Sequence, residues 1–187
     1  ATSGDTGSAA IEACKLKNNI NIFIIHPHGK ISEVQRRQMT TQLEPNVHNI
    51  AINGNFDDCQ KIVKIILKDS ELLSKTNINT VNSINWARII FQTVYYYWAF
   101  LQIEKEIDFV DFIVPSGNFG NVYAGKVAKK MGLPIDKLHV VTNSNDILHR
   151  TITKGEMSIE EVKKTCSPSM DIQISSNFER QLFESTG

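Results

Sequence analysis

The first segment whose residue types could do chemistry is VPSGNFGN, at Val114 to Asn121. An apolar run at Phe109 to Val114 predicts a strand before the turn, and a helical pattern begins near Val122. Glycine lets the backbone turn its N–H groups inward, and the first turn of a helix offers further N–H groups and a positive dipole end. Such a turn is suited to binding a phosphate. The spacing alone is equally compatible with an ordinary strand-to-helix turn that contains two glycines.

A nucleotide-binding loop is an alternative for the same region, because Gly120 to Lys126 fits the pattern GxxxxGK. The next residue is Val127, where such loops need a Ser or Thr that binds magnesium. The lysine would also lie inside the predicted helix. This interpretation is therefore the weakest of the functional ones.

A second candidate is ATSGDTGS, a hydroxyl-rich turn at Ala1 to Ser8 that precedes a predicted helix at Ala9 to Lys17. Its N–H groups and hydroxyls could bind a carboxylate or phosphate oxygen. The alternative is a plain helix start with Asp5 or Thr6 as the N-cap. The carboxylate of Asp5 is an unusual neighbour for an anion, which favours the capping interpretation when the segment is taken alone.

A third candidate is VNSINWAR, at Val81 to Arg88, which leads into a long helical pattern. Arg88 falls in the first turn of that helix, and Ser83 and Asn85 precede it. A guanidinium near a helix N-terminus, joined by a hydroxyl and an amide, could bind a second phosphate. An ion pair between Arg88 and a carboxylate is the alternative, and it is the more common case when the segment is taken in isolation.

The same helix carries an aromatic cluster that could suggest stacking on nucleobases. Basic residues are not interleaved with it, so we expect the cluster to pack in the core. Its members are Tyr95, Tyr96, Tyr97, Trp98 and Phe100.

Two histidines flank a proline in HPHGKIS, at His26 to Ser32. This spacing could suggest a metal, but a third ligand at a convincing distance in the sequence is missing, so we expect no metal site. Lys30 is expected to face solvent or an anion.

Four apolar runs rich in Ile and Val predict buried parallel strands. They lie at Ile20 to Ile25, Val47 to Ile52, Phe109 to Val114 and Leu138 to Val141. A capping box of Ser32 and Gln35 precedes a helical pattern at Val34 to Leu43, and Asp57 precedes another at Cys59 to Leu67. The alternation predicts an α/β fold of open, mostly parallel sheets flanked by helices. A polar stretch from Ser74 to Asn82 is the predicted domain boundary, dividing residues 1–77 from residues 78–187.

Charge and cysteine content exclude several function classes. Twenty basic and twenty acidic residues cancel, which argues against nucleic acid and membrane surfaces as partners. The longest apolar stretch, Ile89 to Ile103, is too short to cross a bilayer. Cys14, Cys59 and Cys166 suggest neither a disulfide framework nor a zinc site, so we expect a reducing cytoplasm.

Six segments, in the right order along nearly the whole chain, resemble threonine synthases of the bacterial and fungal kind, within fold type II of the pyridoxal-phosphate enzymes. They are ATSGDTGSAA at Ala1 to Ala10, HPHGKIS, VNSINWAR, VPSGNFGN, TNSND at Thr142 to Asp146, and SPSMDIQISSNFER at Ser167 to Arg180. The resemblance implies a two-lobed architecture, with residues 1–77 in the smaller lobe and residues 78–187 in the larger one.

The resemblance also assigns site residues. It implies that the cofactor phosphate is held at Gly117, Asn118, Phe119, Gly120 and Asn121, where the family more often has Asp at the last position. It implies that Ser3, Gly4 and Thr6 meet the substrate carboxylate and that Asp5 lies at the edge of the cofactor ring. It implies that Ser83, Asn85 and Arg88 bind the phosphate of O-phosphohomoserine, and we group Lys30 with these substrate residues.

The implied reaction converts O-phospho-L-homoserine and water to L-threonine and phosphate, with pyridoxal phosphate as the electron sink. The resemblance places the Schiff-base lysine before Ala1, so we expect no catalytic residue in this chain, an internal fragment that is inactive alone. Apolar surfaces exposed by truncation would then favour self-association. The alternatives are another fold type II enzyme, such as a serine or threonine dehydratase, and a non-catalytic binder of phosphorylated metabolites.

Overall fold

The structure is a computed structural model that describes residues 1–2, 4–103 and 106–186, apart from the side chain of Asp57. The chain divides into two compact units, Ala1–Asn82 and Ser83–Gly187. This division falls at the end of the polar stretch, later than the predicted boundary after residue 77. The assignment of the two parts to the lobes of a larger enzyme stays a prediction.

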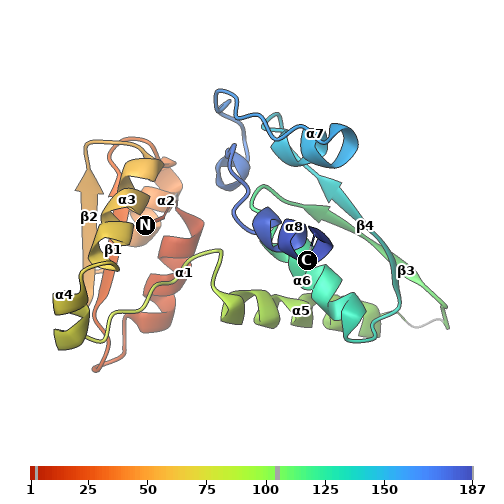
Figure 1. Cartoon of the computed structure of the whole chain (residues 1–187). Coiled ribbons are helices and arrows are strands. Elements are labelled where there is room, and N and C mark those ends of the chain that lie inside the picture. The colour runs from red at the N-terminus through yellow and green to blue at the C-terminus, as the bar shows by residue number, and fades with distance from the viewer. Residues whose placement is uncertain (3, 104–105, 187) are drawn as a thin grey trace. The chain divides into compact units, whose positions relative to one another are not determined.

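The first unit is built on a two-stranded parallel sheet of β1 (Ile22–Pro27) and β2 (Val47–Ile52), paired in register from Ile22 opposite Val47 to Pro27 opposite Ile52. Helices α1 (Asp5–Cys14) and α2 (Glu33–Thr40) contact each other, and α1 and α3 (Phe56–Ile66) contact β1. Helix α4 (Ser70–Lys75) completes the unit (Figure 1). A small core joins α1, β1 and α2, and its buried members are Ala10, Ile11, Ile22, Ile24 and Met39.

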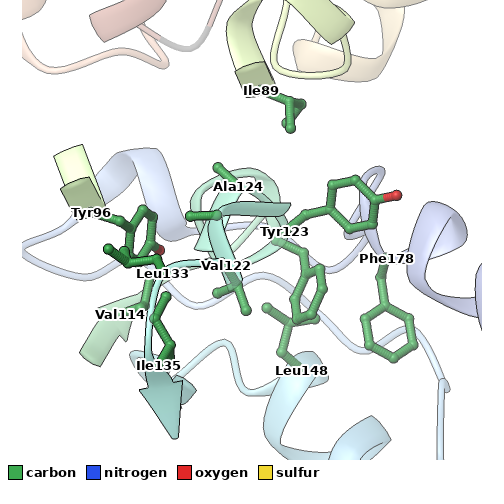
Figure 2. Close-up of a cluster of buried hydrophobic side chains, with 12 residues drawn as sticks. Ile89, Tyr96, Val114, Val122, Tyr123, Ala124, Leu133, Ile135, Leu148 and Phe178 are labelled. Atoms are coloured by element: carbon green, nitrogen blue, oxygen red, sulfur yellow. The ribbon is translucent and has the colours of Figure 1, made fainter. Parts of the chain in front are cut away.

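The second unit has the same plan, with β3 (Val110–Pro115) and β4 (Ile135–Val141) paired in parallel. Helix α6 (Gly120–Lys130) connects the strands and packs on α5 (Trp86–Leu101), on β4 and on α8 (Phe178–Thr186). Helix α7 (Ile147–Lys154) contacts β4, and a short 3-10 helix, η1 (Pro168–Met170), lies in the long segment before α8. Figure 2 shows the core around α6, with Val122 and Ala124 among residues from α5, the strands, α7 and α8.

The α/β class with parallel strands is therefore confirmed. Burial of the strands is confirmed only for β1, in which every residue except Phe23 is buried. It was wrong for β2, which has no buried residue, and largely wrong for β3 and β4, which have one each. In the described chain each sheet has only two strands, so each strand has one edge without a strand partner, and a two-stranded sheet buries few of its residues.

Two predicted helix starts were also wrong. Helix α3 begins at Phe56 with Asn55 as its N-cap, and Asn55 forms a capping box with Asp58, so Asp57 is not the cap. Helix α1 begins at Asp5, with Gly4 in the N-cap position, so Asp5 and Thr6 are helical residues. The N-cap at Ser32 was right, because the Ser32 hydroxyl accepts a hydrogen bond from the Gln35 N–H at 3.2 Å.

The aromatic cluster of α5 was predicted to be core, and this holds only in part. Tyr96 is buried and meets Phe112 edge to face at 4.9 Å, whereas Tyr95 and Trp98 are 64% and 66% exposed. The reason is helical periodicity: one face of α5 packs on α6 and meets Phe112 of β3, whereas Tyr95 and Trp98 lie on positions of the helix that stay exposed. None of the described helices is long and apolar enough to span a membrane.

Candidate functional site

The best-formed candidate site lies where β3 ends and α6 begins. The Ser116 N–H donates to the Val141 carbonyl at 2.9 Å, which fixes the end of the strand, and the Ser116 hydroxyl accepts from the Phe119 N–H at 3.0 Å. Helix α6 then starts at Gly120 with no side-chain cap and no acidic residue in its first turn. The first N–H groups of a helix have no acceptor within it and carry the positive end of its dipole. The turn therefore presents the donors and the charge that an anion requires.

Phe119 adopts the left-handed conformation, with φ of 60°, and no other described non-glycine residue has a positive φ. For a residue with a side chain this conformation costs about 1–2 kcal/mol. Packing offsets the cost, because the Phe119 ring is buried and meets the Phe178 ring edge to face at 5.1 Å. Packing of Phe119 in the core of the unit thus stabilises the backbone conformation of the turn.

The side chain of Asn118 ties this turn to two other segments. Its amide nitrogen donates to the Ser83 hydroxyl, and its amide oxygen accepts from the Ser176 N–H at 2.7 Å. A methyl group at Gly117 would lie 3.1–3.2 Å from Ile172 and from the Cα of Met170. The Asn118 side chain is therefore occupied within the protein, and a phosphate at this turn would be bound by backbone N–H groups.

Asn121 has its side chain turned toward α5. The Tyr96 hydroxyl donates to the Asn121 side-chain oxygen at 2.9 Å and to its backbone carbonyl at 2.7 Å, and burial raises the pKa of Tyr96. The Asn121 amide nitrogen donates to Gln92 at 3.4 Å. Any contribution of Asn121 to anion binding therefore comes from its N–H in the first turn of α6.

From Ser83 onward, the VNSINWAR segment lies in the same unit as this turn. Asn85 is the N-cap of α5, accepting from the Ala87 N–H at 2.9 Å, and Arg88 is half-buried in the first turn of the helix. Ser83 contacts Asn118 as described above. The structure therefore brings one residue of the predicted substrate-phosphate set against one residue of the predicted cofactor-phosphate set.

The hydroxyl-rich turn lies in the first unit, and its N–H groups are largely satisfied within the protein. The buried Thr2 hydroxyl accepts from the Gly4 N–H at 3.0 Å and from the Gly7 N–H at 2.9 Å. Gly4 has φ of 141°, which a side chain would rarely adopt. Ser3, one of the predicted substrate residues, lies outside the described residues, and Thr6 is half-buried in the first turn of α1.

Asp5 is held by Gln35, whose amide nitrogen donates to the Asp5 carboxylate at 2.6 Å. The amide oxygen of Gln35 accepts from the Ser32 hydroxyl at 2.9 Å, so Gln35 links the loop after β1 to the start of α1. Sequence reasoning used Gln35 only as a helix cap and missed this second role.

The histidine pair does not converge on one site. His26 is buried, with no hydrogen-bond partner for Nδ1 among the described residues, whereas His28 and Lys30 are exposed. His, Cys, Asp and Glu side chains within the described ranges form no group of three that could hold a metal.

The lysine of the GxxxxGK pattern is turned away from the phosphate turn. Lys126 donates to Gln181 at 2.8 Å and pairs with Glu184 at 2.7 Å, both on α8. A side chain at Gly125 would overlap the Tyr96 ring at 2.7–2.8 Å, so this glycine permits close packing of α5 and α6. The nucleotide interpretation has no support in this geometry.

Comparison with known proteins assigns the chain to a family. The family model for pyridoxal-phosphate dependent enzymes matches residues 1–187. The chain belongs to this family. Pyridoxal phosphate, the predicted cofactor, is thereby confirmed at the level of the family.

Within the pyridoxal-phosphate dependent enzymes, the chain is similar to proteins named threonine synthase. It is 56% identical over 187 residues to the one from Pseudomonas aeruginosa, covering 100% of this chain and 40% of that protein. It is 54% identical to the one from Saccharomyces cerevisiae, covering 98% of this chain and 36% of that protein. The PLP-bound threonine synthase structure from Brucella melitensis superposes with a TM-score of 0.86 at 53% identity, covering 98% of this chain and 40% of that one. The chain thus spans about two fifths of the length of the relatives it matches.

Proposed function

We propose that this chain forms part of a threonine synthase, which uses pyridoxal phosphate to convert O-phospho-L-homoserine and water to L-threonine and phosphate. The observation that carries the proposal is the uncapped N-terminus of α6, joined through Asn118 to Ser83. Two neighbouring segments with anion-binding chemistry match a reaction in which both cofactor and substrate carry a phosphate. The identity with relatives named threonine synthase supports the same reaction.

The proposal gives each segment a task. The backbone N–H groups of Gly117 to Asn121 hold the cofactor phosphate, and the turn fits that group because it has neither a side-chain cap nor an acidic first turn. When bound, the cofactor supplies an electron sink for the substrate. Ser83 and Arg88 hold the substrate phosphate, with Asn85 shaping the start of α5.

The first unit is assigned the carboxylate end of the substrate. Gly4 and Thr6, with Ser3, contact that carboxylate, and Asp5 lies against the cofactor ring. The bond from Gln35 holds Asp5 in place and the hydroxyl of Thr2 fixes the turn, which limits the reorganisation needed on binding. Lys30, exposed in the loop after β1, adds a positive charge for an anionic substrate. The proposed compartment is the cytoplasm, where the three free cysteines stay reduced.

A chimera tests the reaction directly. This chain replaces the matching part of the Pseudomonas aeruginosa threonine synthase, and phosphate release from O-phospho-L-homoserine is measured beside deamination of serine and threonine. We expect phosphate release with formation of threonine. Deamination without phosphate release would favour the dehydratase alternative, and cofactor binding without either reaction would favour a non-catalytic binder.

Arg88→Ala in the same chimera tests the substrate-phosphate site. Losing a hydrogen bond to a charged group costs about 1.5–3 kcal/mol, so kcat/KM should fall roughly ten- to a hundred-fold while cofactor binding is kept. Arg88→Lys should rescue only part of the loss, because lysine lacks the planar fork. Arg36→Ala is the control, since Arg36 pairs with Glu33 on the exposed face of α2. Loss of cofactor binding with unchanged kinetics would show that the two phosphate sites are assigned wrongly.

A further inference from the structure

Asn177 is a fully buried polar residue that occupies the position just before α8. Its side-chain amide nitrogen donates to the Ser83 carbonyl at 2.8 Å and to the Asn118 carbonyl at 3.1 Å. Its backbone N–H donates to the Asn118 carbonyl at 3.2 Å. A single side chain therefore bridges the backbones of the two loops to which we assign the two phosphates.

The residues around Asn177 contact the same two loops. The Ser176 N–H donates to the Asn118 side chain, and the Phe178 ring packs against the Phe119 ring. In the first turn of α8, the Arg180 guanidinium donates to the Ile84 carbonyl at 2.5 Å and lies 5.7 Å from the centre of the Trp86 ring. Ser176 to Arg180 thus hold the segment Ser83–Trp86 against the turn Gly117–Asn121.

Two chemical facts single out Asn177 within this arrangement. A primary amide carries two N–H donors on one nitrogen, so it can serve two carbonyl oxygens at once, which a carboxylate or an apolar side chain cannot do. Gly120 leaves room for that nitrogen, because a methyl group there would lie only 3.3 Å from it. The Asn177 amide nitrogen therefore donates to both loops, and the absence of a side chain at Gly120 leaves room for it.

We propose that Asn177 is a positioning residue that sets the Ser83–Trp86 segment and the Gly117–Asn121 turn against each other, so that both phosphate sites depend on it. The proposal rests on the proposed function for the identity of the phosphates. The bridge itself rests on hydrogen bonds within this chain. Asn177 acts through the two loops and has no assigned contact with substrate or cofactor.

The bridge is tested first by fluorescence, without any ligand. Trp98→Phe leaves Trp86 as the single tryptophan of the chain, and Trp98 is exposed, so the change leaves the core intact. In this background Asn177→Ala and Asn177→Asp should make Trp86 more accessible to acrylamide and shift its emission. The aspartate should be at least as damaging as the alanine, because it places a carboxylate against two carbonyl oxygens.

A matched variant separates positioning from general loss of stability. Ile135 is buried at the start of β4, where it pairs with Val110 at the opposite end of the sheet from the turn. Ile135→Ala removes core volume without touching the bridge, and its thermal midpoint gives a reference for destabilisation. We expect it to leave Trp86 quenching unchanged under conditions where the chain is folded.

The second measurement is equilibrium dialysis of the full chain with 4-deoxypyridoxine 5'-phosphate, which has no aldehyde to react with lysines. Losing the two amide bonds should weaken its binding about five- to ten-fold in both Asn177 variants, and Ile135→Ala should not. Unchanged quenching and affinity in the Asn177 variants, or equal changes in Ile135→Ala, would overturn the proposal. If the unsubstituted chain binds no analogue, the phosphate site proposed for the Gly117–Asn121 turn fails on that result, and the quenching comparison still decides the role of Asn177.

Discussion

The two glycine-containing turns of this chain both lead into a helix, but they differ in whether a buried hydroxyl accepts from a backbone N–H of that helix. At the start of α1, the buried hydroxyl of Thr2 accepts from the N–H groups of Gly4 and Gly7. At the start of α6, the hydroxyl of Ser116 accepts from Phe119, the residue before the helix, and no side chain of the described residues caps the helix itself. We call the first turn closed, because the Thr2 hydroxyl occupies the Gly7 N–H of its helix, and the second one open, because no side chain of the described residues caps α6.

The comparison indicates which feature of a glycine-containing turn favours anion binding. Glycines and hydroxyls are present in both turns, so composition does not separate them. What separates them is the N–H group that each buried hydroxyl reaches. The Thr2 hydroxyl reaches an N–H group inside its helix, whereas the Ser116 hydroxyl reaches the N–H group of Phe119, which precedes its helix. The closed turn offers a fixed contact surface for the substrate carboxylate proposed above, and the open one is suited to holding a phosphate.

The largest expected effect is that of Thr2→Val, which keeps the shape of the side chain and removes its acceptor. Leaving a buried donor unpaired costs about 1–3 kcal/mol, and two donors are affected. We expect a large loss in the free energy of unfolding and faster amide hydrogen exchange at Gly4 and Gly7. Thr2→Ser keeps the hydroxyl and should retain most of the stability. Normal exchange in Thr2→Val would show that the hydroxyl does not close this turn.

Gly117→Ala should disturb the open turn by a smaller amount. The new methyl group would press on Ile172 and on the backbone at Met170, and such overpacking costs about 1–3 kcal/mol. We expect weaker binding of 4-deoxypyridoxine 5'-phosphate as well as a lower unfolding midpoint. Gly155→Ala is the control, because Gly155 has a positive φ and open space around it. It should lower stability without changing affinity, and an affinity loss shared by both variants would contradict the special role of Gly117.

The smallest expected effect concerns acid stability and compares one carboxylate from each unit. Hydrogen bonds from Lys126, Lys130 and Tyr123 lower the pKa of Glu184 to about 2, and those from Arg36 and Arg37 lower the pKa of Glu33 to about 2. A lowered carboxyl pKa contributes stability above its ordinary value of 4.5, and this contribution is lost as the pH falls toward 2.

Unfolding midpoints measured between these pH values for Glu184→Gln and Glu33→Gln should each show a weaker acid dependence than the unsubstituted chain. Glu184 joins α8 to α6, whereas Glu33 pairs within a single helix. We therefore expect the larger change for Glu184→Gln. A larger change for Glu33→Gln would argue that the link between α6 and α8 contributes little.

Local signals predicted the open turn well. The strand before VPSGNFGN and the helix after it were expected within a few residues, because an apolar run and a glycine-rich turn determine both locally. The same holds for Arg88 in the first turn of α5. The secondary structure at each of these residues depends on its neighbours in the sequence, so a local sequence pattern is enough to predict it.

The contacts that complete the site could not be predicted in this way. Gln35 meeting Asp5 and Asn177 meeting Ser83 join residues that are 30 and 94 positions apart, and an amide leaves no periodic pattern that reveals its partner. The start of α1 was predicted at Ala9 and lies at Asp5, and the hydroxyl that accepts from the Gly7 N–H comes from Thr2 rather than from Asp5 or Thr6, the caps of the alternative interpretation. Exposure of Tyr95 and Trp98 was missed because it depends on which elements lie beside α5.

The long-range bond from Asn177 to Ser83 also has a consequence for the order of folding. Contacts between residues far apart in sequence form after the loop between them has closed, and closing a longer loop costs more entropy. During synthesis on the ribosome, Ser83 and the Gly117–Asn121 turn emerge well before Asn177 does. We therefore expect the turn to remain loosely held until α8 has been made, so that a nascent chain ending before Asn177 would bind the cofactor analogue poorly even with every residue of the turn in place.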